Sequence, residues 1–257
     1  MISEKLSIVV PVYNEVTSIR DVFVYFQKLK TPIEIEWIVV DDASSDGTAE
    51  ILREMSKKFG FQLLFQSRNQ GKGAAVRAGL MVCTGSLIMI QDADFEYSIF
   101  DIPKLIEPLL SENADVVFGS RFKKSSTQVH RTYHYFINRF LTFLSNLLSG
   151  IYLTDMETCY KVFRADLLKS MNLKSERFGI EVELTAYLAK SEARVYEVPI
   201  EYFPRSYLQG KKISWKDGVA AIWHLVRFNL IESKADAFKG LPKKYELSYN
   251  RRKEISV

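Results

Sequence analysis

The sequence predicts an α/β protein built on a mostly parallel β-sheet flanked by helices. Short runs rich in Val and Ile alternate with longer segments of helical periodicity. These runs are apolar throughout, which is typical of parallel strands buried on both faces. The 257 residues are 47% hydrophobic and 26% charged, so the chain is neither disordered nor a disulfide-rich miniprotein.

The first half of the chain repeats the strand–helix pattern regularly. We expect strands over residues 6–12, 36–40, 62–66, 86–90 and 115–119, and helices over 17–29, 47–59, 71–82 and 102–110. Ligands of such sheets bind at the carboxyl ends of the strands. Polar side chains follow these ends, which predicts a binding cleft there: Tyr13, Asn14, Glu15, Asp41, Asp42, Asp92, Asp94, Ser120 and Arg121.

The pattern changes after Arg121, where residues 133–148 are strongly apolar. A polar stripe at helical spacing predicts an amphipathic helix with a wide apolar face, and consists of Asn138, Thr142, Ser145 and Ser149. Two interpretations of this helix are open: burial against the sheet, or a position in a membrane interface. The later elements that we expect are a strand or loop over 155–163, a helix over 181–190, a strand over 193–202 and a helix over 215–231.

These patterns predict one catalytic domain over residues 1–232, which includes amphipathic helices near 133–149 and 214–231, and a basic tail over 233–257. The net charge of +4 is too balanced to indicate a nucleic-acid partner. No stretch reaches the roughly 18 uncharged apolar residues of a membrane span. Cys83 and Cys159 show no CxxC spacing, so we expect reduced core thiols in a reducing compartment.

Asp92 and Asp94 directly follow an apolar strand, with only Ala93 between them. Two carboxylates at a strand end can address one divalent cation, and Mg²⁺ and Mn²⁺ prefer such hard oxygen ligands. A metal held there bridges a diphosphate and neutralises a leaving group. The position therefore predicts a Mg²⁺ or Mn²⁺ site.

Five ordered motifs carry a resemblance to a known family. They are Pro11–Glu15, Val39–Thr48, Asn69–Ala75, Asp92–Asp94 and Gly119–Arg121, and the similarity continues through Thr154–Lys161 and 205–218. Over about residues 5–230 the chain resembles the inverting family 2 glycosyltransferases, which have the Rossmann-like GT-A fold. Within that family it is most similar to the dolichol-phosphate mannosyltransferases and polyprenyl-phosphate glucosyltransferases.

The resemblance implies a role for each matching residue. The catalytic residues would be Asp92, Asp94 and Arg121, and the metal ligands Asp92, Asp94 and Glu96, the last at a position that is commonly Gln in the mannosyltransferases. The donor would be held by Pro11, Tyr13, Glu15, Val40, Asp42, Ala93, Arg205 and Lys211. The acceptor phosphate would be bound by Arg121 and Arg131.

The reaction that follows is metal-dependent transfer of a hexose, with inversion, from GDP-mannose or UDP-glucose to dolichyl or undecaprenyl phosphate. A phosphate acceptor is already anionic and needs no general base, whereas bidentate arginines suit it. Such an acceptor requires peripheral contact with the cytoplasmic face of a membrane, or a membrane partner subunit.

Two alternatives stay open at this point. A sugar or protein hydroxyl acceptor would require a base, for which Asp155 and Glu157 are the candidates. A non-catalytic nucleotide-sugar-binding subunit is disfavoured by the intact Asp92 and Asp94. A Rossmann dehydrogenase is poorly supported because no G-x-G-x-x-G follows the first strand.

Overall fold

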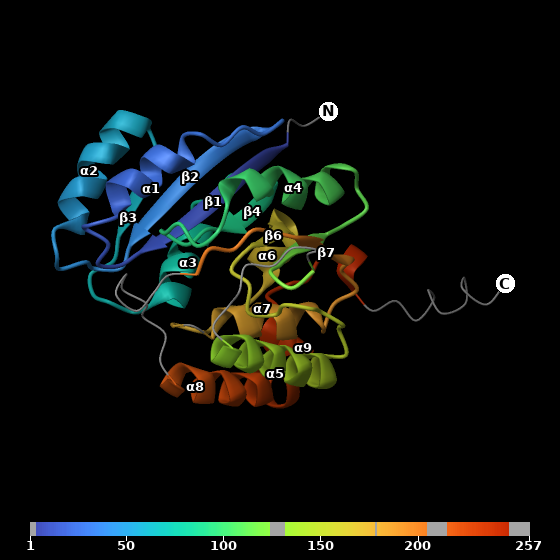
Figure 1. Ribbon diagram of the computed structural model, residues 1–257. Helices are drawn as coiled ribbons and strands as arrows, with labels where there is room; N and C mark the ends of the chain where they lie inside the picture. Colours follow the sequence, from blue (N-terminus) through green and yellow to red (C-terminus); the bar gives the residue numbers. More distant parts are fainter. Residues whose placement is uncertain (1–3, 124–131, 178, 205–214, 247–257) are drawn as a thin grey trace.

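The computed structural model describes residues 4–123, 132–177, 179–204 and 215–246 (Figure 1). Seven strands form one sheet in the order β3-β2-β1-β4-β6-β5-β7, in which β6 runs antiparallel to both neighbours and the other pairs are parallel. The strands are β1 (Lys5–Val12), β2 (Glu34–Asp41), β3 (Gln62–Phe65), β4 (Leu87–Ile90), β5 (Val116–Ser120), β6 (Lys161–Arg164) and β7 (Val195–Pro199). The predicted α/β fold with a mostly parallel sheet is confirmed.

The register of the central strands explains where the polar cleft residues gather. β1 pairs with β2 on one side, so that Val12 lies beside Asp41, and with β4 on the other, so that Val9 lies beside Ile90. Residues 8–10 of β1, 38–40 of β2 and 87–89 of β4 are fully buried and hold the sheet in the core. The carboxyl ends of β1, β2 and β4 therefore meet at one edge, and the loops that leave them lie side by side.

The helices agree with the predicted segments within a few residues, except for the short α6 and α9, which were not predicted, and for the end of the last predicted helix. They are α1 (Ile19–Phe26), α2 (Thr48–Phe59), α3 (Lys72–Leu80), α4 (Ile102–Leu110), α5 (Thr132–Ser149), α6 (Ala165–Ser170), α7 (Ile180–Leu188), α8 (Trp215–Val226) and α9 (Lys234–Ala237). The helix expected over 215–231 changes to a π-helical turn at Arg227–Ile231. The strand expected within 155–163 begins only at Lys161, because residues 155–160 form a loop at the cleft.

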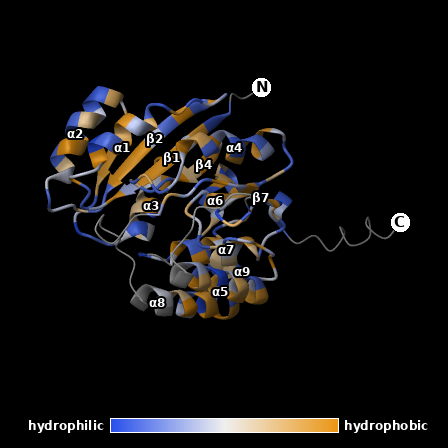
Figure 2. Cartoon of the chain, viewed as in Figure 1, coloured by the Kyte–Doolittle hydropathy of each residue, from blue (hydrophilic) through white to orange (hydrophobic). Residues whose placement is uncertain are grey.

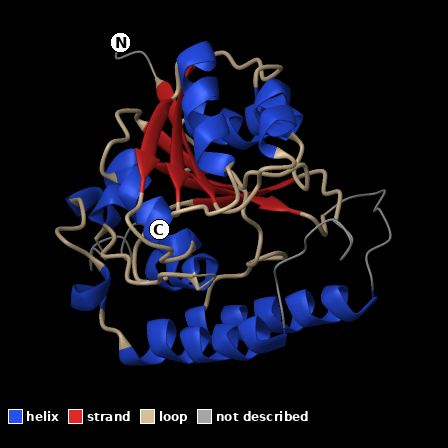
Figure 3. Ribbon diagram, turned by 90° about the vertical axis from the view of Figure 1, so that its left-hand side faces the viewer, coloured by secondary structure: helices blue, strands red, loops and turns tan. Residues whose placement is uncertain are grey.

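Three helices form a layer beyond the sheet. α5 and α8 lie side by side along one side of the molecule, and both contact α7, which lies between them and the sheet (Figure 1, Figure 3). All nine residues of α7 are buried. The layer thus has a buried inner helix and two outer ones.

Part of the segment expected to be a tail packs on this body. Ala237 and Tyr245 are buried, and the backbone N–H of Glu192 donates to the carbonyl of Tyr245 at 3.0 Å. The Tyr245 hydroxyl also reaches Asp166 on α6. Residues 234–245 are therefore joined to the catalytic body, and positions 247–257 lie outside the described residues.

Candidate active site

Hydrogen bonds join the loops that follow β1 and β2. The Asn14 backbone N–H donates to the Ser44 hydroxyl, and Ser45 N–H donates back to Asn14 Oδ1, both at 2.9 Å. Glu15 N–H donates to the Thr48 hydroxyl at 2.9 Å. Asn14 adopts a left-handed backbone with φ of 50°, a conformation that Asn tolerates better than most residues. These bonds fix the loop that presents Tyr13 and Glu15.

Asp42 organises the loop that follows β3. Its carboxylate accepts from the backbone N–H groups of Gln70 and Gly71, at 2.9 and 2.7 Å, and from the Asn69 amide at 2.9 Å. The side chain is only 2% exposed. Its neighbour Asp41 is equally buried, and Asp41 Oδ1 has no hydrogen-bond partner among the described residues. Asp42 therefore fixes the loop after β3 at the carboxyl end of β2.

Close packing explains the glycines of this loop. A Cβ on Gly71 would lie 2.6 Å from the Glu176 carbonyl oxygen, and one on Gly73 would collide with the Ser175 carbonyl oxygen. Gly71 also has φ of +93°. These glycines permit close packing at the start of α3, and the close approach brings Lys72 beside Asp92.

Lys72 connects three elements of the site. Its ammonium lies 2.7 Å from Asp92 Oδ1, after β4, and 2.8 Å from Glu181 Oε1, in the first turn of α7. The three side chains are 12%, 27% and 10% exposed respectively. Burial alone would lower the pKa of Lys72, but Asp92 and the other nearby anionic groups outweigh it and raise that pKa well above its usual value.

The two other predicted metal ligands, Asp94 and Glu96, follow Asp92 in the same loop. Asp94 Oδ1 accepts from the Glu96 backbone N–H at 2.9 Å, while the Glu96 carboxylate accepts from the Tyr202 hydroxyl at 3.0 Å. Across the described ranges, no three His, Cys, Asp or Glu side chains come together as a metal-binding group. The predicted three-carboxylate set is thus not assembled. The hard oxygens of Asp92 and Asp94 still suit a divalent ion that takes its other ligands from a diphosphate and water.

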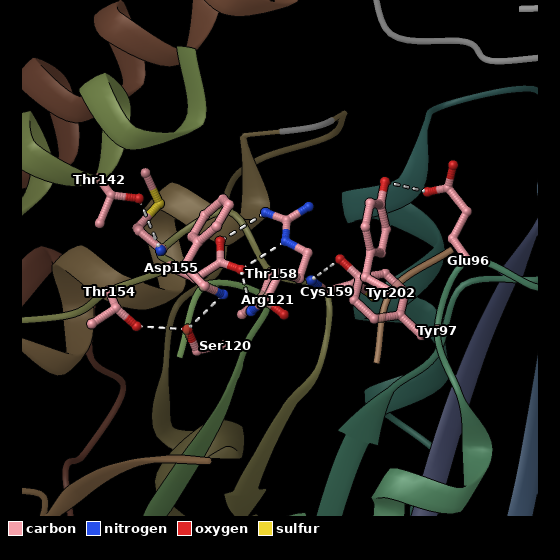
Figure 4. A network of polar contacts seen from close by, with 12 residues as sticks. Glu96, Tyr97, Ser120, Arg121, Thr142, Thr154, Asp155, Thr158, Cys159 and Tyr202 are labelled. Atoms are coloured by element: carbon pink, nitrogen blue, oxygen red, sulfur yellow. Dashed lines mark hydrogen bonds and ion pairs between the residues drawn. The ribbon is translucent and has the colours of Figure 1, made fainter. Parts of the chain in front are cut away.

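Arg121 lies at the end of β5 in a bidentate ion pair (Figure 4). Its Nε and Nη2 each donate at 2.7 Å to the two oxygens of Asp155, and its backbone N–H also donates to that carboxylate. The guanidinium carbon lies 5.0 Å from the centre of the Tyr202 ring. Burial lowers the pKa of Arg121, but Asp155 outweighs it and raises that pKa above its usual value. Arg121 is 8% exposed, and the ion pair holds its permanently charged guanidinium in a fixed orientation.

Glu157 is the second carboxylate of the same loop. Glu157 Oε1 is buried without a hydrogen bond among the described residues. Burial and the nearby Glu181 carboxylate raise the pKa of Glu157 to about 7, against the opposing effect of Lys161. Lys161 is itself buried and donates to the Met156 carbonyl at 3.0 Å.

The amphipathic helix α5 turns its polar stripe inward. Thr142 and Ser145 are 2% and 1% exposed, and the Thr142 hydroxyl accepts from Met156 N–H in the cleft loop. The side chains on the opposite side are 55–69% exposed, namely Phe136, Phe140, Phe143 and Leu147. Hydrophobic residues accordingly appear along this outer helix as well as in the sheet (Figure 2). These four apolar side chains are therefore not buried, whereas Leu141 and Leu144 of the same helix pack on the core.

The predicted site residues divide into three groups. Tyr13, Glu15, Asp92, Asp94 and Arg121 follow strand ends at the same edge of the sheet, whereas the Val40 side chain is fully buried in the core and Ala93 is 6% exposed. Arg131, Arg205 and Lys211 lie outside the described residues. Sequence patterns missed Lys72 and Glu181, although the Gly-Lys-Gly of residues 71–73 was a signal for the first.

A family model described as glycosyl transferase family 2 matches residues 7–171, which include the cleft residues from Pro11 to Glu157. The chain belongs to this family. It is therefore a glycosyltransferase, and the cleft at the strand ends is its candidate active site.

Of three relatives with similar sequences, two have names that describe a glycosyltransferase. An uncharacterized protein of Methanocaldococcus jannaschii is 31% identical over 218 residues, which cover 80% of this chain and 93% of the relative. The glycosyltransferase AglJ of Haloferax volcanii is 30% identical, over 79% of this chain and 64% of its own length. Dolichyl-phosphate beta-glucosyltransferase ALG5D of Trichomonas vaginalis is 30% identical, over 81% and 68%.

Solved structures share the fold of this family 2 enzyme. Glucosyl-3-phosphoglycerate synthase from Mycobacterium tuberculosis, crystallised with Mn²⁺, uridine diphosphate and phosphoglyceric acid, superposes with a TM-score of 0.65. It is 19% identical, and the match covers 90% of this chain and 80% of that one. The GT-A fold is thereby confirmed. Among the described helices, none is both long and apolar enough to cross a bilayer.

Proposed function

We propose that this glycosyltransferase moves a hexose, with inversion, from a nucleotide-diphosphate sugar to a polyprenyl phosphate at the cytoplasmic face of a membrane. The outward-facing aromatic side of α5 is the observation that carries the proposal. Four large apolar side chains exposed to water are unfavourable for a protein that stays in solution. A lipid-linked acceptor, in contrast, requires contact with a bilayer, in which such side chains are favourable.

The same helix adjoins the candidate acceptor region. Phe122, next to Arg121, packs edge-on against Tyr135 of α5 with ring centres 5.4 Å apart. Arg139 of α5 donates to the Thr154 carbonyl at 3.1 Å. Exposed side chains of α8 and of the turn after it extend the apolar surface, namely Ile222, Trp223, Leu230 and Ile231. A membrane docked on these helices would place a lipid phosphate near Arg121.

Arg121 would receive that phosphate. Asp155 uses Nε and Nη2 of the guanidinium, which leaves Nη1 as the nitrogen not bound to that carboxylate. Because an acceptor phosphate is nucleophilic when ionised, the protein has to orient it and screen its charge rather than remove a proton. A buried arginine in a rigid pair performs this role at every physiological pH.

The donor would bind across the loops after β1, β2 and β4. Asp92 and Asp94 would hold Mg²⁺ or Mn²⁺, which neutralises charge that develops on the departing diphosphate. The Mn²⁺ and uridine diphosphate bound to the structural relative support this assignment, as does the dolichyl-phosphate acceptor in the name of the sequence relative. Tyr13 and Glu15 would contact the nucleoside, together with Pro11 and Asp42.

A donor and acceptor screen tests the proposal directly. Purified protein is incubated with UDP-glucose or GDP-mannose, a short polyprenyl phosphate and Mn²⁺, and release of nucleoside diphosphate is measured. We expect release with one donor, loss of release in EDTA, and no transfer to the matching polyprenol. Equal transfer to the polyprenol would contradict the phosphate-acceptor assignment.

Glu157 favours a second candidate function, transfer to a hydroxyl acceptor. Asp155 is unsuited to act as the base because it is fully buried and bound to Arg121. Glu157 has a raised pKa of about 7 and would accept a proton above that pH. If Glu157 is the base, turnover should rise with pH through about 7, and Glu157→Gln should abolish both turnover and this rise. Unchanged turnover in Glu157→Gln would exclude it.

A further inference from the structure

The ammonium of Lys72 contacts the carboxylate of Asp92, which is also a proposed metal ligand. Its ammonium contacts Asp92 Oδ1 at 2.7 Å and is held on its other side by Glu181 at 2.8 Å. The three residues come from the first turn of α3, the end of β4 and the first turn of α7. The ammonium also donates to the Cys159 sulfur at 3.4 Å, so three groups hold it beside Asp92.

An ammonium and a divalent ion compete for one carboxylate oxygen. Two cations within 3 Å of the same atom would repel each other strongly in a site of reduced dielectric. Lys72 therefore has to leave Asp92 Oδ1 when a metal binds there, and Glu181 is already in contact with it. The ammonium can move toward this second carboxylate without entering water.

We propose that Lys72 is a built-in counter-ion of Asp92, and that Glu181 receives the ammonium when the metal arrives. This inference rests on the proposed metal role of Asp92. Both residues are positioning residues: Lys72 neutralises and orients Asp92 in the donor-free enzyme, and Glu181 acts on the metal through Lys72. The arrangement makes metal binding weak until the diphosphate adds its own negative charge.

Titration of the full chain with Mn²⁺ alone, followed by the electron paramagnetic resonance of free Mn²⁺, tests the proposal. Lys72→Met should tighten the Mn²⁺ dissociation constant about tenfold, because the competing charge is gone. Glu181→Gln should weaken it several-fold, because Lys72 then stays on Asp92. The double variant should bind Mn²⁺ as Lys72→Met does, since Glu181 acts only through the ammonium.

The double-mutant cycle separates this mechanism from general electrostatics. If Glu181→Gln weakens Mn²⁺ binding equally with and without Lys72, the two charges act independently and the proposal is wrong. It is also wrong if Lys72→Met leaves the affinity unchanged. Lys72→Arg keeps the charge and should restore weak binding, which a merely structural lysine would not predict.

Lys5→Met is the matched control. Lys5 also bridges two carboxylates, Glu34 at 3.2 Å and Glu36 at 3.4 Å, but at the opposite end of β1. Its loss should leave Mn²⁺ affinity unchanged. Circular dichroism of each variant establishes that it is folded, and Lys72→Gln provides a second neutral variant if Lys72→Met does not fold.

Asp92→Asn distinguishes failure of this inference from failure of the proposed function. If Asp92→Asn leaves Mn²⁺ binding intact, the metal assignment itself fails and the inference with it. If Asp92→Asn abolishes binding while the cycle is additive, the metal role stands and only the counter-ion role of Lys72 is overturned.

Discussion

The polar cleft and the outer helix pair have opposite relations to water. In the cleft, charged side chains are bound to one another, as in the buried pair Arg121 and Asp155 and the half-buried pair Lys72 and Asp92. On α5, by contrast, Phe136 and Phe143 are each 64% exposed. Each region violates the usual distribution of polar and apolar residues, and such violations concentrate at functional sites.

The comparison assigns different tasks to the two regions. Buried ion pairs add little net stability, but they fix the orientation of charges that must meet phosphate. An exposed aromatic face is costly in water and useful only against another apolar phase. Mutations in the cleft should therefore reduce turnover without changing membrane binding, and mutations on the face should reduce membrane binding.

The largest expected effect is that of Asp94→Asn. The substitution removes one proposed metal ligand at constant volume, so turnover should fall about a hundredfold or more. Nucleoside diphosphate release measures it, while vesicle co-sedimentation and the melting temperature should stay as in the wild type. Turnover within a few-fold of the wild type would remove the metal role and the contrast with the outer face.

Arg121→Lys should have the next largest effect. Lysine keeps the charge but not the two parallel bonds to Asp155, so turnover should fall at least about tenfold. The buried Asp155 carboxylate would also lose part of the ion pairing that offsets the cost of its burial, so a lower melting temperature is expected. A rise in KM for the polyprenyl phosphate, with vesicle binding unaltered, would assign Arg121 to the acceptor. A fully active lysine variant would leave it a structural role only.

The fold was predictable from the sequence because parallel strands buried on both faces leave an unmistakable apolar pattern. The helix 102–110 and the strand ends that carry Asp41, Asp92 and Arg121 were located within a residue. The antiparallel β6 was not, since four residues between a loop and the short helix α6 carry little periodicity. Short elements whose structure depends on packing against their neighbours cannot be predicted from local sequence patterns.

The site was predictable only where residues follow strand ends. Lys72 and Glu181 meet across separate elements, α3 and α7, and no spacing along the chain encodes that contact. The orientation of α5 could not be predicted either. Helical periodicity shows which residues share a face of the helix, but it does not show which face packs inward. Tertiary partners of Thr142 and Asn146 decide it, through hydrogen bonds to residues 153 and 156.

The double variant Phe140→Ser with Phe143→Ser sharpens the comparison from the other side. Both rings are more than half exposed, so their loss should leave the free energy of unfolding nearly unchanged. Vesicle binding should weaken about tenfold or more, because each ring buried in lipid contributes on the order of 1–2 kcal/mol. Co-sedimentation and circular dichroism on one sample measure the two quantities.

Leu141→Ser is the matched control on the same helix. Leu141 lies between the two rings in sequence but is only 5% exposed, so its substitution should destabilise the fold by about 2–4 kcal/mol. If instead the double variant unfolds, the rings belong to the core. If it is folded and binds vesicles as well as the wild type, the face of α5 does not meet lipid.

The smallest expected effect concerns charge. Cations near an anionic leaflet add attraction that salt screens within about 10 Å at 0.1 M ionic strength. Replacing Arg251, Arg252 and Lys253 by Gln removes three of them from the C-terminal segment and should weaken binding to vesicles with anionic lipid several-fold at low salt. At 0.5 M salt the triple variant and the wild type should bind alike, because the aromatic contribution is insensitive to ionic strength. Binding that is equally strong on neutral vesicles and at every salt concentration would show that the aromatic face alone is sufficient for membrane binding. The charged side chains of this protein would then bind anionic groups only in the cleft.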